Sequence, residues 1–128
     1  MQIEHIAVGY NSEEESDKFF IELLGMKKIR LKTVSVDLMD RFFGVKREST
    51  FIVYGNEDLR FEVFITNDKS KANDIFTHSC LLIENRDEFL DKASSMDFKV
   101  IKVPRIDDGY YLFIRDSFNN LYEIKEKR

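Results

Sequence analysis

The chain has 128 residues, of which 43% are hydrophobic, and it contains 12 Phe and 5 Tyr but only 1 Pro. This composition is typical of one ordered globular domain and excludes an intrinsically disordered chain. The net charge of −4, without a long basic cluster, disfavours sequence-independent nucleic-acid binding. The single cysteine, Cys80, excludes an internal disulfide and a zinc site built on cysteine clusters.

The hydropathy pattern favours a protein that works in water. No stretch approaches the run of about 18 apolar residues that spans a membrane, and the opening residues MQIEHIAV lack the basic region of a signal peptide. We therefore expect a soluble, cytoplasmic protein without a membrane or nucleic-acid partner.

The first half of the chain reads as a strand, a helix and three further strands. A strand is predicted over residues 3–9, and Ser12 and Glu15 have the spacing of a capping box at a helix start. The helix then shows apolar residues at helical spacing and a glycine at its end, namely Phe19, Phe20, Leu23, Leu24 and Gly25. Three β-rich segments follow, at residues 27–36, 49–54 and 59–65.

The second half repeats this order. A strand is predicted around THSCLLIE, followed by a helix that begins at residues 85–88 and reaches Met96. Strands follow again, at residues 98–103, 110–115 and 121–125. Both halves therefore have the order βαβββ, which indicates an internal repeat.

Two histidines and two glutamates occupy equivalent positions in this repeat. His5 and His78 fall in the first strand of their halves, and Glu62 and Glu123 fall in the last. Because side chains alternate between the faces of a strand, all four are predicted to project from the sheet face that lies away from the helices. Paired imidazole and carboxylate ligands are typical of a site for a divalent metal.

These segments resemble the vicinal oxygen chelate superfamily, which includes glyoxalase I, methylmalonyl-CoA epimerase, fosfomycin and bleomycin resistance proteins and extradiol dioxygenases. The resemblance covers nearly the whole chain and rests on HIAV, FFIELLGMKKI, THSCLLIE and FIRDSFNNLYEIKE. It implies an α+β fold in which the curved sheets of two βαβββ modules form a cavity. The modules would be residues 1–66 and 75–128 of a single domain, joined by residues 67–74, and the protein would be a homodimer.

In its ligand pattern the chain most resembles glyoxalase I, and this resemblance implies a site and an activity. The metal ligands would be His5, Glu62, His78 and Glu123, around Ni, Zn, Co, Mn or Fe. The implied activity is that of a metal-dependent lyase or isomerase, in which a carboxylate moves a proton next to a metal-bound carbonyl or enediolate. Glu123 is the first choice as catalytic base, and Glu62 is the second.

Other activities of the same superfamily stay open. One is epimerisation of an acyl-CoA thioester, which uses similar proton transfer. Another is metal-free binding of a small drug, as in the bleomycin-binding members, and Fe(II)-dependent oxygen chemistry is a third. The segment AVGYNSEEE lacks the Arg that helps glyoxalase I to hold glutathione, so the resemblance does not extend to a glutathione site.

Three further groups of residues are less clear from the sequence. Cys80 shares a strand face with His78 but is expected to be a small buried hydrophobe. For Phe42 and Phe43, a role in the core or in a subunit contact is favoured over substrate contact. Arg60, Phe64 and Lys125 share faces with the proposed ligands, and solvated surface is the expected role of the two cations.

Overall fold

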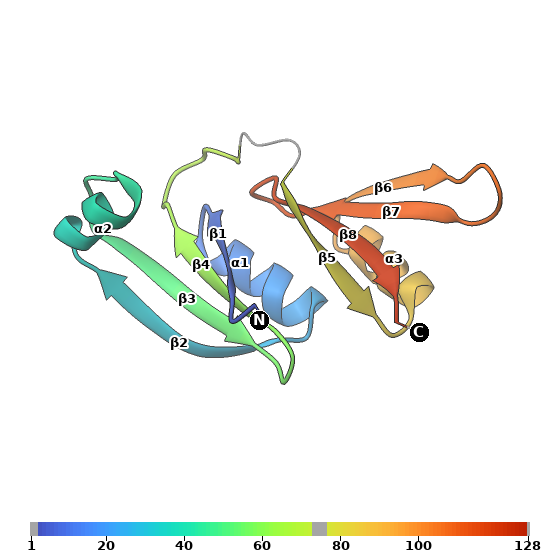
Figure 1. Ribbon diagram of the computed structural model, residues 1–128, viewed down its shortest axis with the longest axis horizontal. Helices are drawn as coiled ribbons and strands as arrows, with labels where there is room; N and C mark the ends of the chain where they lie inside the picture. Colours follow the sequence, from blue (N-terminus) through green and yellow to red (C-terminus); the bar gives the residue numbers. More distant parts are fainter. Residues whose placement is uncertain (1–2, 73–76, 128) are drawn as a thin grey trace. The chain divides into compact units, whose positions relative to one another are not determined.

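The computed structural model describes residues 3–72 and 77–127 of the chain, which falls into two compact units. Unit 1 comprises residues 1–70 and unit 2 comprises residues 71–128. Each unit is built on a four-stranded mixed sheet (Figure 1). Residues 73 and 74 of the predicted linker lie outside the described residues.

Unit 1 has the predicted order of elements with one additional helix. Its elements are β1 (Ile6–Tyr10), α1 (Glu13–Asp17), η1 (Lys18–Leu23), β2 (Lys27–Val34), α2 (Val36–Phe43), β3 (Ser49–Gly55) and β4 (Arg60–Ile65). The η1 segment continues α1 as a π-helix. The sheet order is β1-β4-β3-β2, in which β1 is parallel to β4 and the other pairs are antiparallel.

Unit 2 repeats this arrangement. Its elements are β5 (His78–Ile83), α3 (Arg86–Ser95), β6 (Lys99–Pro104), β7 (Tyr110–Arg115) and β8 (Leu121–Glu126). The sheet order is β5-β8-β7-β6, and β5 is again parallel to β8. The predicted α+β fold of two βαβββ modules is therefore confirmed.

Aromatic rings fill the space between the helix and the sheet in unit 1. Phe20 of η1 stacks on Tyr54 of β3 with ring centroids 4.9 Å apart, and it contacts Phe61 of β4 at 5.1 Å. The Tyr54 hydroxyl donates a hydrogen bond of 2.6 Å to Asp17, so this buried ring also satisfies its polar end. The helix is thereby held on one face of the sheet, and the other face is left for the site.

The α2 helix was not predicted, and the predicted strand 27–36 ends earlier, at Val34. Its local signals are ordinary: the Ser35 hydroxyl accepts a hydrogen bond of 3.3 Å from the Leu38 amide. Gly44 ends the helix in the left-handed region, at φ 69°. The helix has only eight residues and buries one side chain, Met39, so its apolar pattern is shorter than those of the two helices that were predicted.

A turn centred on Asp116 connects β7 to β8 in unit 2. The Asp116 carboxylate accepts hydrogen bonds from the amides of Phe118 and Asn120, from the Asn120 side chain and from the Tyr122 hydroxyl, at 2.9 to 3.0 Å. These bonds fix the start of β8 and hence the position of Glu123. In the described part of the chain, no helix has the length and apolar character needed to cross a membrane.

Candidate functional site

Unit 1 brings His5 and Glu62 together. His5 directly precedes β1, and the parallel register places Ala7 opposite Glu62, so His5 and Glu62 lie on the same sheet face. Nε2 of His5 lies 3.4 Å from Oε1 of Glu62, and the two side chains are 36% and 23% exposed. The other ring nitrogen, Nδ1, is hydrogen-bonded to the Glu4 carboxylate. The imidazole is thus oriented with one nitrogen toward Glu62.

Unit 2 brings His78 and Glu123 together in the same way. The register of β5 and β8 places Cys80 opposite Glu123, and His78 has the same face as Cys80. Nε2 of His78 lies 3.7 Å from Oε2 of Glu123. The His78 ring packs edge-on against Phe113 of β7, with centroids 5.6 Å apart. Each unit therefore carries one half-site, a His and a Glu from its two parallel strands.

The spacing within each half-site fits two ligands of one metal ion. Two ligands at about 2.1 Å from a tetrahedral ion lie roughly 3.4 Å apart. The observed nitrogen-to-oxygen distances are 3.4 Å and 3.7 Å. Imidazole nitrogen and carboxylate oxygen form a donor set that divalent first-row metals accept. Each half-site therefore fits two of the ligands of such an ion.

Neither half-site is a complete metal centre by itself. Among the residues that the structure describes, no group of three or more His, Cys, Asp or Glu side chains is arranged to hold a metal ion. The predicted four-ligand set requires the pair from unit 1 as well as the pair from unit 2.

Cys80 and Lys125 are neighbours of Glu123. Cys80 is exposed, so the expectation that it is a small buried hydrophobe is wrong. Partial desolvation, and then the charge of Glu123, raises the pKa of the Cys80 thiol. A thiol that keeps its proton is a poor metal ligand. Lys125 places Nζ 3.9 Å from Oε1 of Glu123, so this cation lies beside the proposed base.

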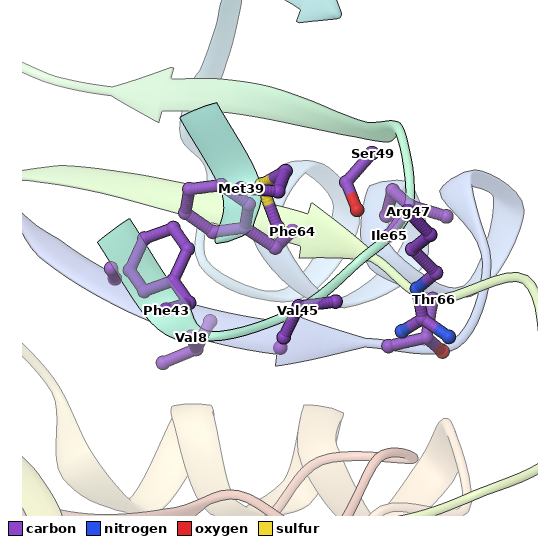
Figure 2. A pocket seen from close by; sticks show the side chains of 11 residues that line it. Val8, Met39, Phe43, Val45, Arg47, Ser49, Phe64, Ile65 and Thr66 are labelled. Carbon is purple, nitrogen blue, oxygen red and sulfur yellow. The ribbon is translucent and has the colours of Figure 1, made fainter. Parts of the chain in front are cut away.

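Unit 1 contains a cavity beside its half-site. Its volume is about 300 Å³, and α2 with the segment after it covers the end of the sheet (Figure 2). The apolar lining comes from Val8, Met39, Phe43, Val45, Phe64 and Ile65, and the polar lining comes from Arg47, Ser49 and Thr66. Ala7, the residue paired with Glu62, also lines it, so the cavity and the half-site are adjacent on one sheet face.

Phe42 and Phe43 lie in α2, and neither is a core residue. The two residues are 64% and 55% exposed, so the core alternative is wrong, and the subunit contact stays a prediction. Phe43 packs edge-on against Phe64, with ring centroids 5.2 Å apart, and lines the cavity. The cavity was not predicted, because its lining includes residues of α2, and that helix was not predicted either.

The family is decided by comparison over almost the whole chain. Residues 2–124 match the model of the Glyoxalase/Bleomycin resistance protein/Dioxygenase superfamily. The chain belongs to this superfamily. No curated protein matches the chain significantly.

Several solved structures share the fold of this chain. A glyoxalase family protein from Bacillus cereus has a TM-score of 0.75 and 16% identity, with 98% of this chain and 93% of that chain covered. The fosfomycin resistance protein FosX from Listeria monocytogenes has a TM-score of 0.72 and 14% identity, with 100% and 94% covered. FosX has also been solved with Mn(II) and sulfate, with a TM-score of 0.70, 14% identity and coverage of 99% and 93%. At these identities the likeness shows the fold alone.

Proposed function

We propose that His5, Glu62, His78 and Glu123 together hold one divalent metal ion, and that the protein is a metal-dependent lyase or isomerase of the glyoxalase type. The observation that carries this proposal is the repetition of the His and Glu pair. Each unit presents one imidazole and one carboxylate from equivalent parallel strands, at a spacing that fits adjacent metal ligands. Two unrelated surface pairs would not be expected to share strand positions.

The chain's own residues can then carry out proton transfer. A bound divalent ion would supply Lewis-acid stabilisation of the negative charge that develops on a substrate oxygen. Glu123 takes the proton from the carbon next to the carbonyl and returns it to the neighbouring carbon, with Glu62 as the second choice for this base. Tyr122 and Ile124 are buried on either side of Glu123, which keeps its backbone fixed during the transfer.

The source of the four ligands and the identity of the metal are separate parts of the proposal. The two half-sites meet either within one chain or across a homodimer. Homodimerisation, a single-domain organisation and a cytoplasmic location stay predictions. Because FosX, a superfamily member, has been solved with Mn(II), manganese belongs in a screen with Ni, Zn, Co and Fe(II).

A metal-free binding protein is the second candidate function. The apolar cavity of unit 1 favours it, because a volume of about 300 Å³ suits a small organic molecule. This candidate predicts ligand binding without any uptake of metal. Retained metal therefore distinguishes the enzyme from the binding protein.

The enzymatic proposal is tested by turnover with each metal, using a hemithioacetal and an acyl-CoA thioester as substrates. Turnover of the first indicates a glyoxalase, and turnover of the second indicates an epimerase. The Glu123→Gln variant should be slower than the wild type by about 100-fold or more, because it lacks the base. Glu126→Gln, an exposed position in the same strand, is the control and should keep full activity. Unchanged activity in Glu123→Gln would contradict Glu123 as the base, and absence of turnover with every metal would contradict the enzymatic proposal.

A further inference from the structure

The cavity of unit 1 has two chemically different ends. Figure 2 shows the rings of Phe43 and Phe64 together at one end, and Arg47 with Thr66 at the other. Phe51 also stacks on Phe64, with ring centroids 5.2 Å apart, and this contact supports the aromatic end. An aromatic or apolar group suits the first end, and a negatively charged group suits the second.

The two ends follow one another along β4, starting from the half-site. Glu62, Phe64 and Thr66 alternate in position with the buried Val63 and Ile65, so they share the open face of the sheet. At a strand rise of about 3.3 Å per residue, Thr66 lies roughly 13 Å beyond Glu62. The order from the half-site is therefore carboxylate, aromatic ring and cationic end.

Arg47 is available to bind an anion. Among the described residues, it forms no ion pair within 4.0 Å. The pKa of Asp68 is lowered, mainly by hydrogen bonds from the hydroxyl and the amide of Ser70 and least by the charge of Arg47. That carboxylate already accepts hydrogen bonds from the Ser70 amide at 2.9 Å and from the Thr66 hydroxyl at 3.1 Å. Ser49, which is only 5% exposed, adds a hydroxyl to the cavity wall near this end.

We propose that the substrate is an amphipathic anion, with an apolar or aromatic body between its reacting carbon and its carboxylate, sulfonate or phosphate group. The body packs against the contacting rings of Phe43 and Phe64, the anionic group binds Arg47, and the reacting carbon faces Glu62. This proposal rests on the proposed function, because it takes the His5 and Glu62 half-site as the place of reaction. It adds the chemical class of the substrate, which the ligand set does not specify.

The test is an NMR titration of the metal-free protein with 4-phenylbutanoate and with its neutral analogue 4-phenylbutanamide. The carboxylate should bind about tenfold more tightly than the amide, because a charge-assisted hydrogen bond to Arg47 is lost in the amide. The amide signals of Ala7, Phe64 and Thr66 should shift on binding. Arg47→Gln should remove the preference, and Lys46→Gln, a neighbouring cation outside the cavity lining, should retain it.

A second pair of variants tests the aromatic end. Phe43→Ala should weaken the binding of both compounds by about fivefold or more, and Phe42→Ala should change neither, since Phe42 does not line the cavity. Equal binding of the two compounds by the wild type, or a preference that persists in Arg47→Gln, would overturn the proposal. Absence of binding by either compound would overturn it as well.

The same titration separates this proposal from the proposed function. Because no metal is present, the preference for the carboxylate does not depend on the four-ligand site. If the protein prefers the carboxylate but takes up no metal, the proposed substrate class stands and the proposed metalloenzyme function is overturned. Metal uptake without the preference would overturn only the ligand class.

Discussion

At the scale of single residues, the two histidines are held differently. Nδ1 of His5 is hydrogen-bonded to the Glu4 carboxylate, whereas the ring of His78 packs against Phe113. A carboxylate on the second nitrogen of a metal-ligating imidazole fixes its orientation and makes it a better ligand. With His5 as a proposed metal ligand, Glu4 is therefore expected to be a positioning residue for the half-site of unit 1.

The Glu4→Gln variant should bind the divalent ion about tenfold more weakly than the wild type, because Gln is a weaker acceptor for the imidazole N–H. Glu57→Gln, in the exposed turn between β3 and β4, is the matched control and should bind as the wild type does. A metal titration followed by calorimetry measures both. Equal affinities in the Glu4 and Glu57 variants would show that Glu4 has no role at the site.

Asp116 has a structural role that depends on pH. Burial raises its pKa to about 6, against the opposing effect of the hydrogen bonds from Asn120, Tyr122 and Phe118. The unfolded chain loses this proton near pH 3.8, and the folded chain keeps it until about pH 6. The folded state therefore binds more protons in this window, and the contribution of Asp116 to stability falls as the pH rises.

The Asp116→Asn variant should lack this dependence. The free energy of unfolding of the wild type, relative to the variant, should fall by about 1–3 kcal/mol between pH 4 and pH 6.5, as a shift of this size requires. Urea unfolding of both proteins across this range measures the difference. A constant difference between the two proteins, or one that grows with pH, would contradict the raised pKa.

At the scale of elements, α2 distinguishes unit 1 from unit 2. Both units have a helix on one face of the sheet, but unit 1 adds α2, and the cavity is lined partly by its residues Met39 and Phe43. The helix is short, and most of its apolar side chains are exposed. Its stability depends on its caps and on its contact with Phe64.

Removing a cap should loosen α2 without unfolding the sheet. The Ser35→Ala variant should destabilise α2 by about 1 kcal/mol, because the Leu38 amide loses its acceptor. Hydrogen exchange of the amides of residues 39–43 should become about fivefold faster, while β3 and β4 keep their protection. Ser12→Ala removes the equivalent cap of α1 and should leave the exchange of α2 unchanged. Unchanged exchange in α2 of the Ser35 variant would contradict this role of the cap.

The elements also show which features follow from the sequence. The β strands and the two longer helical segments were predictable because their apolar residues recur over many positions, as Phe61, Val63 and Ile65 do in β4. The contact of Glu4 with His5 was not predictable. It joins consecutive residues before β1, where the alternation of a strand does not yet apply. The cavity was not predicted, because α2 was not predicted. The lining of the cavity combines residues from β1, α2, β3, β4 and the segment between α2 and β3.

At the scale of the whole molecule, the repeat divides the proposed chemistry between two units. Each unit has its own sheet and would supply two of the four proposed ligands, and among the described residues neither half-site is a complete metal centre alone. The proposed ligands repeat from one unit to the other, whereas α2 and its cavity belong to unit 1. We therefore expect the repeated His and Glu pairs to bind the metal, and α2 with the cavity of unit 1, which the described part of unit 2 does not repeat, to select the substrate.

The most direct measurement is the metal content per chain of the wild type and of His5→Ala, His78→Ala and the double variant, all purified without chelator. About one divalent ion per four-ligand site is expected in the wild type, with a clear loss in each single variant and no metal in the double variant. Thermal unfolding of the metal-free proteins provides the control that all four are folded. A wild type that contains no metal, and that takes up none of Ni, Zn, Co, Mn or Fe(II), would overturn the proposed four-ligand metal site, as would a folded double variant that retains its metal.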